Sequence, residues 1–300
     1  TDPVKDSRPL ALSYGSQLIL KRLNVWDSLS PVTPIQTIHI SNHGHAGQTL
    51  IQSDDAGVPV LGSVVNYHAL YDGLYQRMQH QQVTFQLGAK VTSLVNQSDH
   101  VQVDYEQAGE MRSVVAKLLV LADGGKLASQ VEGIQYHTHD YQQWAVVANI
   151  QTSIDQRGIA YEHFTLDGPV ALLPSGTGYA LVWTVPAGQV DSILNWDDAT
   201  FLSELQAHFG DMAGQFVSCG KRAGFPLTLK YASPGIAQRT VLIGNASQTL
   251  HPVAGQGFNL GLRDAWELAS ELVRPANFVV DVGSSRLLSA FASKRQIDRE

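Results

Sequence analysis

The hydrophobic pattern of residues 239–273 predicts a strand, a long turn and a helix in direct succession. Residues 239–243 read Arg-Thr-Val-Leu-Ile, the β-branched and apolar composition of a short buried strand. Beyond the turn, apolar residues recur at helical spacing at Leu262, Ala265, Trp266, Ala269, Leu272 and Val273. We expect a helix of about three to four turns that begins near Gly257 or Phe258.

A second buried strand is predicted at residues 117–121, where Lys-Leu-Leu-Val-Leu precedes Ala122, Asp123 and Gly124. A continuous apolar run of this kind is typical of a parallel strand that delivers an acid at its C-terminal end. The alternative is an ordinary strand-terminating turn, in which Asp-Gly is common.

Alternating and helical patterns predict further elements in the first half of the chain. Leu18, Ile19 and Leu23 fit one face of a helix that Ser13 or Ser16 could cap. A second helix is expected at 68–78. Strands are expected at 37–41, which we take as part of a hairpin, and at 61–66, 83–85, 90–95 and 101–105.

From residue 141 to about 225 the pattern changes to strands that carry aromatic residues. These strands are expected at 144–150, 160–165, 170–173 and 179–185. One helix is expected at 197–209, with Asp197 or Asp198 as its cap. We interpret this region as an antiparallel sheet inserted between two other segments of the fold.

Composition and charge limit the kinds of partner. Of the 300 residues, 44% are hydrophobic, which is enough for a substantial core, and the formal net charge is -7. Nucleic acid is excluded as a partner because no cluster of Lys and Arg is present to neutralise phosphates. No apolar run approaches the ~20 residues that a membrane-spanning helix needs. The single Cys219 fits a reducing compartment, and we expect a cytoplasmic protein.

His39, His43 and His45 invite a metal-site interpretation, which we reject. A strand followed by Gly44 and Gly47 gives these rings no fixed ligand geometry, and no carboxylate or cysteine joins them.

The turn after residue 243 carries a proline and several glycines, more backbone freedom than a plain connection needs. A ligand that the main chain approaches closely would explain it. The first amides of the following helix have no intrahelical partners and lie at the positive end of its dipole, so they suit phosphate or a delocalised anion. As a bare glycine pattern, Gly255, Gly257 and Gly261 do not match the usual dinucleotide fingerprint.

The whole string 244–261, GNASQTLHPVAGQGFNLG, resembles the second flavin-binding motif of the FAD-dependent aromatic hydroxylases. Asn245, where most members carry Asp, resembles the ubiquinone-biosynthesis branch, in particular the 2-polyprenyl-6-methoxyphenol hydroxylases. Segments 13–26, 37–47, 164–174 and 291–300 also resemble that branch, so the resemblance covers nearly the whole chain.

The resemblance implies a set of FAD contacts. Asn245 would bind the ribityl chain through its amide group, although it lacks the charge of an aspartate. Arg8 would reach the FAD phosphates, and Asp123 would support the pyrophosphate region and the use of reduced nicotinamide. The remaining cofactor residues that it implies are Gly244, Pro252, Gly255, Gln256, Gly257, Phe258 and Asn259.

The resemblance also implies the reaction. NAD(P)H would reduce FAD, and reduced flavin would activate O2 for transfer of one oxygen atom to an electron-rich phenol ring carbon. The substrate would be a prenylated phenol. Peripheral association with a membrane or with other ubiquinone-biosynthesis proteins, and assembly into a homo-oligomer, are left open. No catalytic acid or base is identified. Two alternatives remain, a related hydroxylase of a small soluble aromatic and a non-catalytic fragment without flavin.

The expected fold class is α/β (α+β), with an incomplete Rossmann-like FAD-binding domain of the aromatic-hydroxylase type and an inserted antiparallel substrate sheet. The FAD-binding domain would comprise residues 1–140, including substrate-side strands within 35–65, and residues 226–300. The substrate sheet would comprise residues 141–225. We expect the chain to be a fragment whose first βαβ unit, with its GxGxxG turn, is absent, and these 300 residues alone to bind FAD weakly and to be inactive.

Overall fold

The computed structural model describes residues 8–44, 47–249, 256–273 and 281–296. By its internal contacts the chain divides into two compact units. The first comprises residues 1–81, 140–227 and 252–256, and the second comprises residues 82–139, 228–251 and 257–300. The assignment of residues 1–140, 141–225 and 226–300 to cofactor and substrate roles stays a prediction.

The first unit is built on a large sheet whose strand order is β10-β13-β12-β11-β3-β4, with β14 paired to β10. The strands are β3 (Thr37–Asn42), β4 (Gln48–Gln52), β10 (Gln135–Thr152), β11 (Ile159–Thr165), β12 (Gly168–Ser175), β13 (Gly178–Pro186) and β14 (Phe216–Cys219). The expected hairpin of β3 and β4 is confirmed. The strands between residues 141 and 225 pair antiparallel, as predicted, and β3 from the N-terminal part of the chain joins them parallel to β11.

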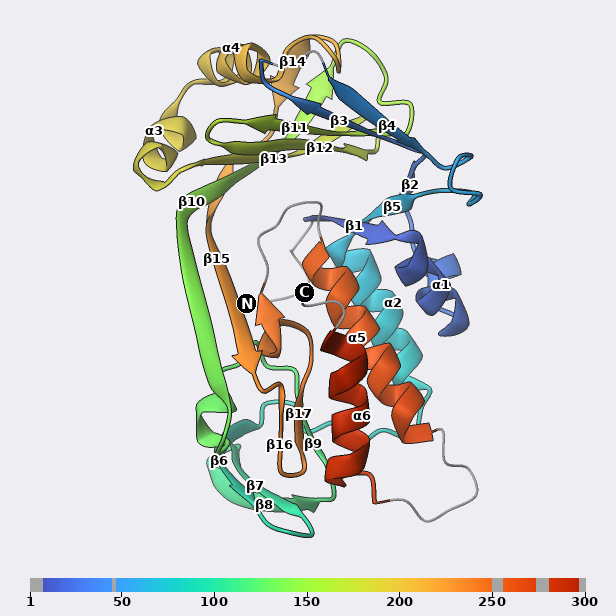
Figure 1. Ribbon diagram of the computed structural model, residues 1–300, viewed down its shortest axis with the longest axis vertical. Helices are drawn as coiled ribbons and strands as arrows, with labels where there is room; N and C mark the ends of the chain where they lie inside the picture. Colours follow the sequence, from blue (N-terminus) through green and yellow to red (C-terminus); the bar gives the residue numbers. More distant parts are fainter. Residues whose placement is uncertain (1–7, 45–46, 250–255, 274–280, 297–300) are drawn as a thin grey trace. The chain divides into compact units, whose positions relative to one another are not determined.

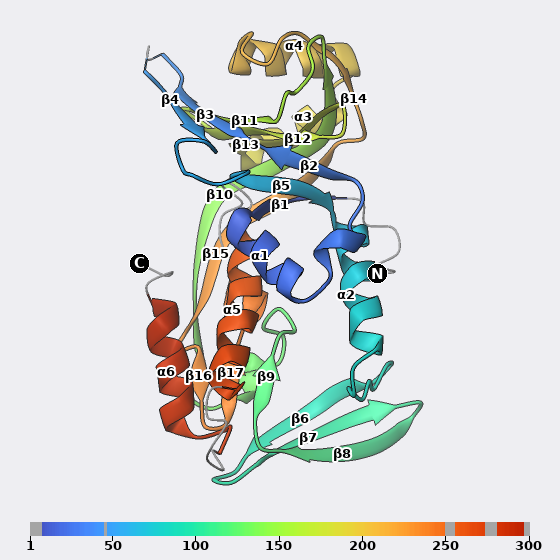
Figure 2. The same cartoon turned by 90° about the vertical axis from the view of Figure 1, so that its right-hand side faces the viewer.

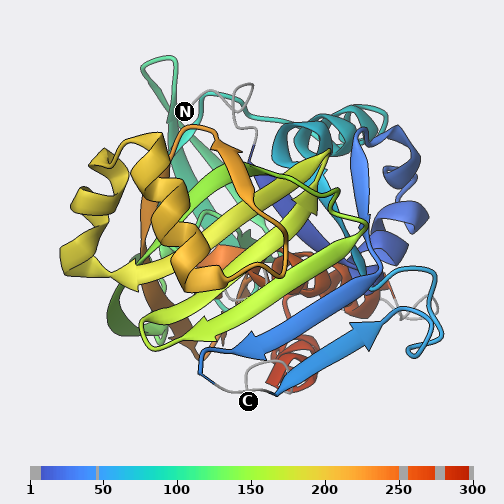
Figure 3. The same ribbon diagram turned by 90° about the horizontal axis from the view of Figure 1, so that it is seen from above.

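Two helices, α3 (Val190–Asn195) and α4 (Asp198–Phe209), cover one face of this sheet (Figure 3). Asp197 caps α4 as expected, since its side chain accepts a hydrogen bond of 2.7 Å from the Thr200 amide. The sequence pattern did not predict α3. Phe201, Leu205 and Phe209 are fully buried against inward residues of the strands, which makes this interface the core of the unit.

A smaller sheet of the first unit has the order β1-β5-β2. Its elements and neighbours are β1 (Pro9–Ser13), α1 (Tyr14–Arg22), η2 (Trp26–Ser28), β2 (Val32–Ile35), β5 (Gly62–Asn66) and α2 (Tyr67–Gln79), whereas the short helix η4 (Ala187–Gln189) lies next to α3. Ser13 caps α1. The predicted buried face of α1 was wrong, because Leu18 and Leu23 are 39% and 37% exposed while Leu20 is buried.

The second unit contains two small sheets, with strand orders β6-β7-β8 and β16-β17-β9 (Figure 2). Their strands are β6 (Lys90–Asn96), β7 (Val101–Gln107), β8 (Glu110–Ala116), β9 (Leu119–Leu121), β16 (Ile236–Ala237) and β17 (Thr240–Leu242). β9 and β17 are parallel, which confirms the prediction for residues 117–121. Residues 83–85 are not a strand, and β8 was not predicted.

Helices α5 (Gln256–Val273) and α6 (Ser285–Gln296) lie side by side against the sheet that contains β17 (Figure 1). The predicted start of α5 is right to within one residue, but its predicted buried face was wrong. Val273 is 76% exposed, whereas Asp264, Leu268 and Glu271 are buried. The two acids are tolerated there because α6 supplies cations to pair with them.

The remaining elements are β15 (Ala223–Ser233), which pairs with β18 (Gln248–Thr249), and the short helices η3 (Ala128–Gln130) and η5 (Gly244–Ala246). Among the described residues, no helix combines the length and the apolar character that crossing a bilayer requires.

Candidate functional site

Two turns that the sequence singled out leave neighbouring parallel strands of the second unit at the same edge. Leu121 of β9 lies opposite Leu242 of β17, and Asp123 and Gly244 each follow two residues later. In open α/β sheets, ligands bind at the carboxyl ends of parallel strands. The structure therefore brings the Asp-Gly turn and the start of the 244–261 segment together.

The carboxylate of Asp123 organises the first turn. Its Oδ1 accepts a hydrogen bond of 2.8 Å from the Gly125 amide, and its Oδ2 accepts one of 2.8 Å from the Leu127 amide. Gly124 and Gly125 both have positive φ, so the turn needs residues without a Cβ. The turn interpretation is thus correct in detail, and the contribution of Asp123 to FAD binding stays a prediction.

The second turn is packed tightly against α5. Gly244 has φ +57, and a Cβ added to Gly261 would lie 3.1 Å from the Gly244 Cα. Gly261 therefore serves the contact between helix and turn, whereas a Cβ on Gly257 would meet no protein atom within 4 Å. Among the glycines of this segment that the structure describes, Gly257 alone leaves its space open to a ligand.

The buried ion pair of Asp264 and Arg295 holds this turn in place through the Gly244 amide. The Gly244 amide donates a hydrogen bond of 2.9 Å to Oδ2 of Asp264, and Nε of Arg295 donates one of 2.6 Å to Oδ1. Both side chains are 3% exposed. The hydrophobic pattern did not predict this pair, although an acid at position 264 in line with Leu268 and Glu271 indicates that the buried face of the helix is partly charged.

Tyr136 joins the two turns. Its hydroxyl donates a hydrogen bond of 2.7 Å to the Ala246 carbonyl, and a Cβ on Gly125 would clash with the same hydroxyl oxygen. Nζ of Lys230 lies 4.0 Å from the centre of the Tyr136 ring. Burial, and then the charge of Asp123, raise the pKa of Tyr136, so the phenol stays a neutral donor.

The residues at the edge fit a flavin cofactor. The side chain of Asn245 is exposed and makes no hydrogen bond with any described residue, so its amide group is available to a hydroxyl-rich ligand. The first-turn amides of α5 belong to Gln256, Gly257, Phe258 and Asn259. Pro252 and Gly255 lie outside the described residues. The amide of Asn245 and the N-terminal amides of α5 are donors that FAD would need here, and Gly257 leaves the space for it.

Arg8 lies in the first unit, at the start of β1. Its guanidinium carbon lies 5.9 Å from the centre of the Tyr67 ring and 5.8 Å from that of Phe225, and its carbonyl accepts a hydrogen bond from the Tyr67 amide. The arginine is exposed, so its proposed contact with phosphate is sterically open.

His39 of β3 and His43 of the turn after it contact protein groups, and His45 lies outside the described residues. Nε2 of His39 lies 2.9 Å from Oε1 of Gln48, and His43 packs against His163. Within the described ranges, no group of three His, Cys, Asp or Glu could hold a metal ion.

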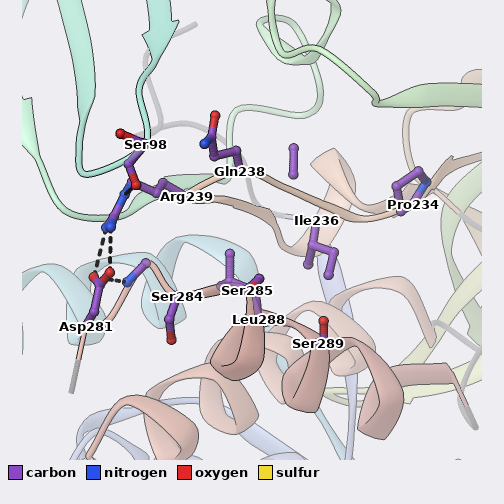
Figure 4. Close-up of a pocket in the computed structure, with 12 residues that line it drawn as sticks. Ser98, Pro234, Ile236, Gln238, Arg239, Asp281, Ser284, Ser285, Leu288 and Ser289 are labelled. Atoms are coloured by element: carbon purple, nitrogen blue, oxygen red, sulfur yellow. Dashed lines mark hydrogen bonds and ion pairs between the residues drawn. The ribbon is translucent and has the colours of Figure 1, made fainter.

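A cavity of about 640 Å³ opens elsewhere in the second unit, beside the start of α6 (Figure 4). Its lining includes Arg239 and four serines, Ser98, Ser284, Ser285 and Ser289. The guanidinium of Arg239 is occupied by Asp281 and by the carbonyls of Ser98 and Lys117, so we assign no ligand to this cavity.

Comparison with known sequences places the chain among flavoproteins. Residues 2–297 match the model of the FAD binding domain family. The chain is 33% identical to ubiquinone hydroxylase UbiL of Rhodospirillum rubrum, with 98% of this chain and 68% of that protein covered. It is 30% identical to 3-demethoxyubiquinol 3-hydroxylase of Escherichia coli, with 99% and 76% covered. The resemblance to the ubiquinone-biosynthesis branch is therefore confirmed.

Solved structures confirm the expected fold. The crystal structure of p-nitrophenol 4-monooxygenase PnpA from Pseudomonas putida has a TM-score of 0.73 at 14% identity, with 97% of this chain and 75% of that chain covered. The flavin-dependent halogenase CmlS has a TM-score of 0.76 at 17% identity, with 95% and 54% covered. The sequence match over nearly the whole chain, the shared fold and the two turns at one sheet edge lead to one conclusion: the chain belongs to the FAD binding domain family of flavoproteins.

Proposed function

We propose that this protein is an FAD-dependent monooxygenase that hydroxylates a polyprenylated phenol in ubiquinone biosynthesis, with NAD(P)H and O2 as co-substrates. The observation that carries the proposal is the similarity of 30–33% over nearly the whole chain to proteins named as ubiquinone-pathway hydroxylases. The arrangement of the Asp123 and Gly244 turns at one sheet edge supports it.

FAD, when bound, supplies electron transfer and the activation of O2. The protein's own groups hold and orient it. Asn245 offers its amide to the ribityl hydroxyls, and Gly257 leaves room for close approach of the main chain. The amides at the start of α5 favour negative charge, which stabilises the anionic reduced cofactor. Asp264, Arg295 and Tyr136 keep the two turns in place.

A hydroxylase of a small soluble phenol is the second candidate function. The similarity of fold to p-nitrophenol 4-monooxygenase is compatible with it, but at 14% identity that similarity concerns the fold alone. The prenylated substrate is favoured because the relatives at 30% identity or more that carry functional names belong to the ubiquinone pathway.

The experiment is NAD(P)H oxidation by the FAD-loaded protein with a short-chain prenylphenol, set against the same phenol without the prenyl group. We expect NAD(P)H oxidation that depends on the prenylphenol. Mass spectrometry should show a product that carries one 18O atom from 18O2. Equal or faster turnover of the small phenol would transfer the assignment to the second candidate. Absence of flavin absorbance in the purified full-length protein would contradict both.

The place of action follows from the substrate. We propose that the protein works in the cytoplasm and meets its prenylated substrate at a membrane surface. The same proposal includes its association with other proteins of ubiquinone biosynthesis and its assembly into a homo-oligomer. Flotation with liposomes that contain the prenylphenol, compared with liposomes that lack it, tests this attachment.

A further inference from the structure

Glu162 occupies an unusual position on β11. Its neighbours Tyr161 and His163 face α4, with ring centres 5.6 Å and 5.9 Å from that of Phe209. Because side chains alternate along a strand, Glu162 projects from the opposite face of the sheet, which α3 and α4 do not cover.

The surroundings of Glu162 on that face are apolar. Ile40 of β3 and Ala171 of β12 flank it directly in the strand register. Further along, Ala160 packs with Ile38 and Leu173, which occupy the same face. A single carboxyl group thus interrupts an apolar surface.

The carboxyl group also lacks a partner. Oε1 of Glu162 is buried and accepts no hydrogen bond from any described residue. Burial raises the pKa of Glu162. By contrast, the adjacent His163 is paired with Ser41 at 2.8 Å, and the buried Glu271 is paired with Lys294. Glu162 as a whole is half-buried, but its Oε1 is shielded from water without a compensating hydrogen bond, which points to a partner that arrives with a ligand.

Building on the function proposed above, we propose that Glu162 is a catalytic residue that accepts the hydroxyl proton of the phenol substrate. The substrate O–H bond weakens or breaks as an O–H bond to a Glu162 oxygen forms, and no electrons leave the ring in this step. Ring carbons then gain electron density, which favours attack on an electrophilic oxygen atom. The same proton returns to the phenol oxygen of the product. The flanking apolar residues would contact the ring.

A matched pair of ligands tests this role directly. Binding of a short-chain prenylphenol and of its methyl ether, which has no hydroxyl proton, is measured by calorimetry on the FAD-loaded protein. We expect the wild type to bind the phenol about tenfold or more tighter than the ether, as a hydrogen bond to a charged group implies. Glu162→Leu and Glu162→Gln should lose most of this preference and lower kcat.

Stability separates this role from a structural one. Because Glu162→Leu replaces an unpaired carboxyl on an apolar face by an apolar side chain, its Tm should equal or exceed that of the wild type. Glu106→Gln, the counterpart of Glu162→Gln at an exposed strand position, is the control and should alter neither binding nor kcat. A Glu162→Leu variant that retains the preference for the phenol and full kcat would overturn the inference. Failure of the wild type itself to hydroxylate prenylphenols would instead overturn the proposed function.

Discussion

Asn245 and Gly257 show how single residues shape the cofactor edge. The rest of the protein does not fill the space at either position: the side chain of Asn245 is exposed, and a Cβ on Gly257 would meet no protein atom within 4 Å. Gly261, one turn further along α5, is used by the protein, since it lies against the Gly244 backbone. Glycines that look equivalent in the sequence therefore have different roles.

Replacing Asn245 by Ala should weaken FAD binding by about 1 to 2 kcal/mol, the range for loss of hydrogen bonds at a polar site. Asn245→Asp should bind FAD as well as the wild type or better, because a carboxylate also accepts hydrogen bonds from ribityl hydroxyls. Fluorescence titration of the apoprotein with FAD measures both. A large loss with Asp would show that the amide donor matters instead.

The two glycines should respond oppositely to substitution. Gly257→Val should abolish retention of FAD while leaving the free energy of unfolding of the apoprotein unchanged. Gly261→Ala should lower that free energy by about 1 kcal/mol or more, since its Cβ presses on backbone atoms. Urea unfolding and the flavin absorbance of the purified variants separate the two effects. Normal flavin content in Gly257→Val would refute its assignment to the flavin-facing turn.

At the scale of elements, the Asp264–Arg295 pair connects α5, α6 and the turn after β17. Asp264 divides its two oxygens between the Gly244 amide and the Arg295 guanidinium. Breaking one side of a buried pair leaves an uncompensated charge, and removing both sides does not.

We therefore expect Arg295→Met to lower the free energy of unfolding by about 3 to 5 kcal/mol, and the double variant Asp264→Asn, Arg295→Met to recover part of it. The side-chain amide oxygen that Asp264→Asn introduces would still accept the Gly244 hydrogen bond, so the double variant should retain more FAD affinity than Arg295→Met.

The control is Arg112→Met in the exposed Arg112–Glu110 pair, which should change stability by less than about 1 kcal/mol. Equal losses in Arg295→Met and in the control, both measured by urea unfolding, would contradict a role for the buried pair.

At the scale of the whole molecule, Arg239 is a joint between four segments of the second unit. Its guanidinium pairs with both oxygens of Asp281 (Figure 4). It also donates to the carbonyls of Ser98 and Lys117. Its hydrogen bonds to Asp281, followed by the Gly283 amide and the charge of Arg239, lower the pKa of Asp281. Stability should therefore depend on pH in the acid range.

The sign follows from this shift. A carboxyl whose pKa is lower in the folded state contributes stability that is complete above its ordinary pKa of 3.8 and is lost as pH falls through the folded value. At pH 5 the Tm of Asp281→Asn should be lower than that of the wild type. As pH falls from about 5 to 2, the Tm of the variant should decrease less than that of the wild type. Parallel decreases in the two proteins would show that Asp281 does not contribute.

Local composition was sufficient to predict much of this protein. Apolar runs before Asp123 and Gly244 predicted both parallel strands, Asp197 predicted the cap of α4, and the 244–261 string predicted the flavoprotein family. These features depend on neighbours in the chain, such as alternation, capping and turn chemistry, so the sequence carries them directly.

Contacts between distant segments were decided only by the tertiary structure. Which face of α5 is buried depends on cations supplied by α6, as in the pair of Asp264 with Arg295, 31 positions away. The unpaired carboxyl of Glu162 is visible only once β3 and β12 flank β11 with apolar residues. Burial and pairing are properties of surfaces brought together from different parts of the chain, and no local pattern specifies which surfaces meet.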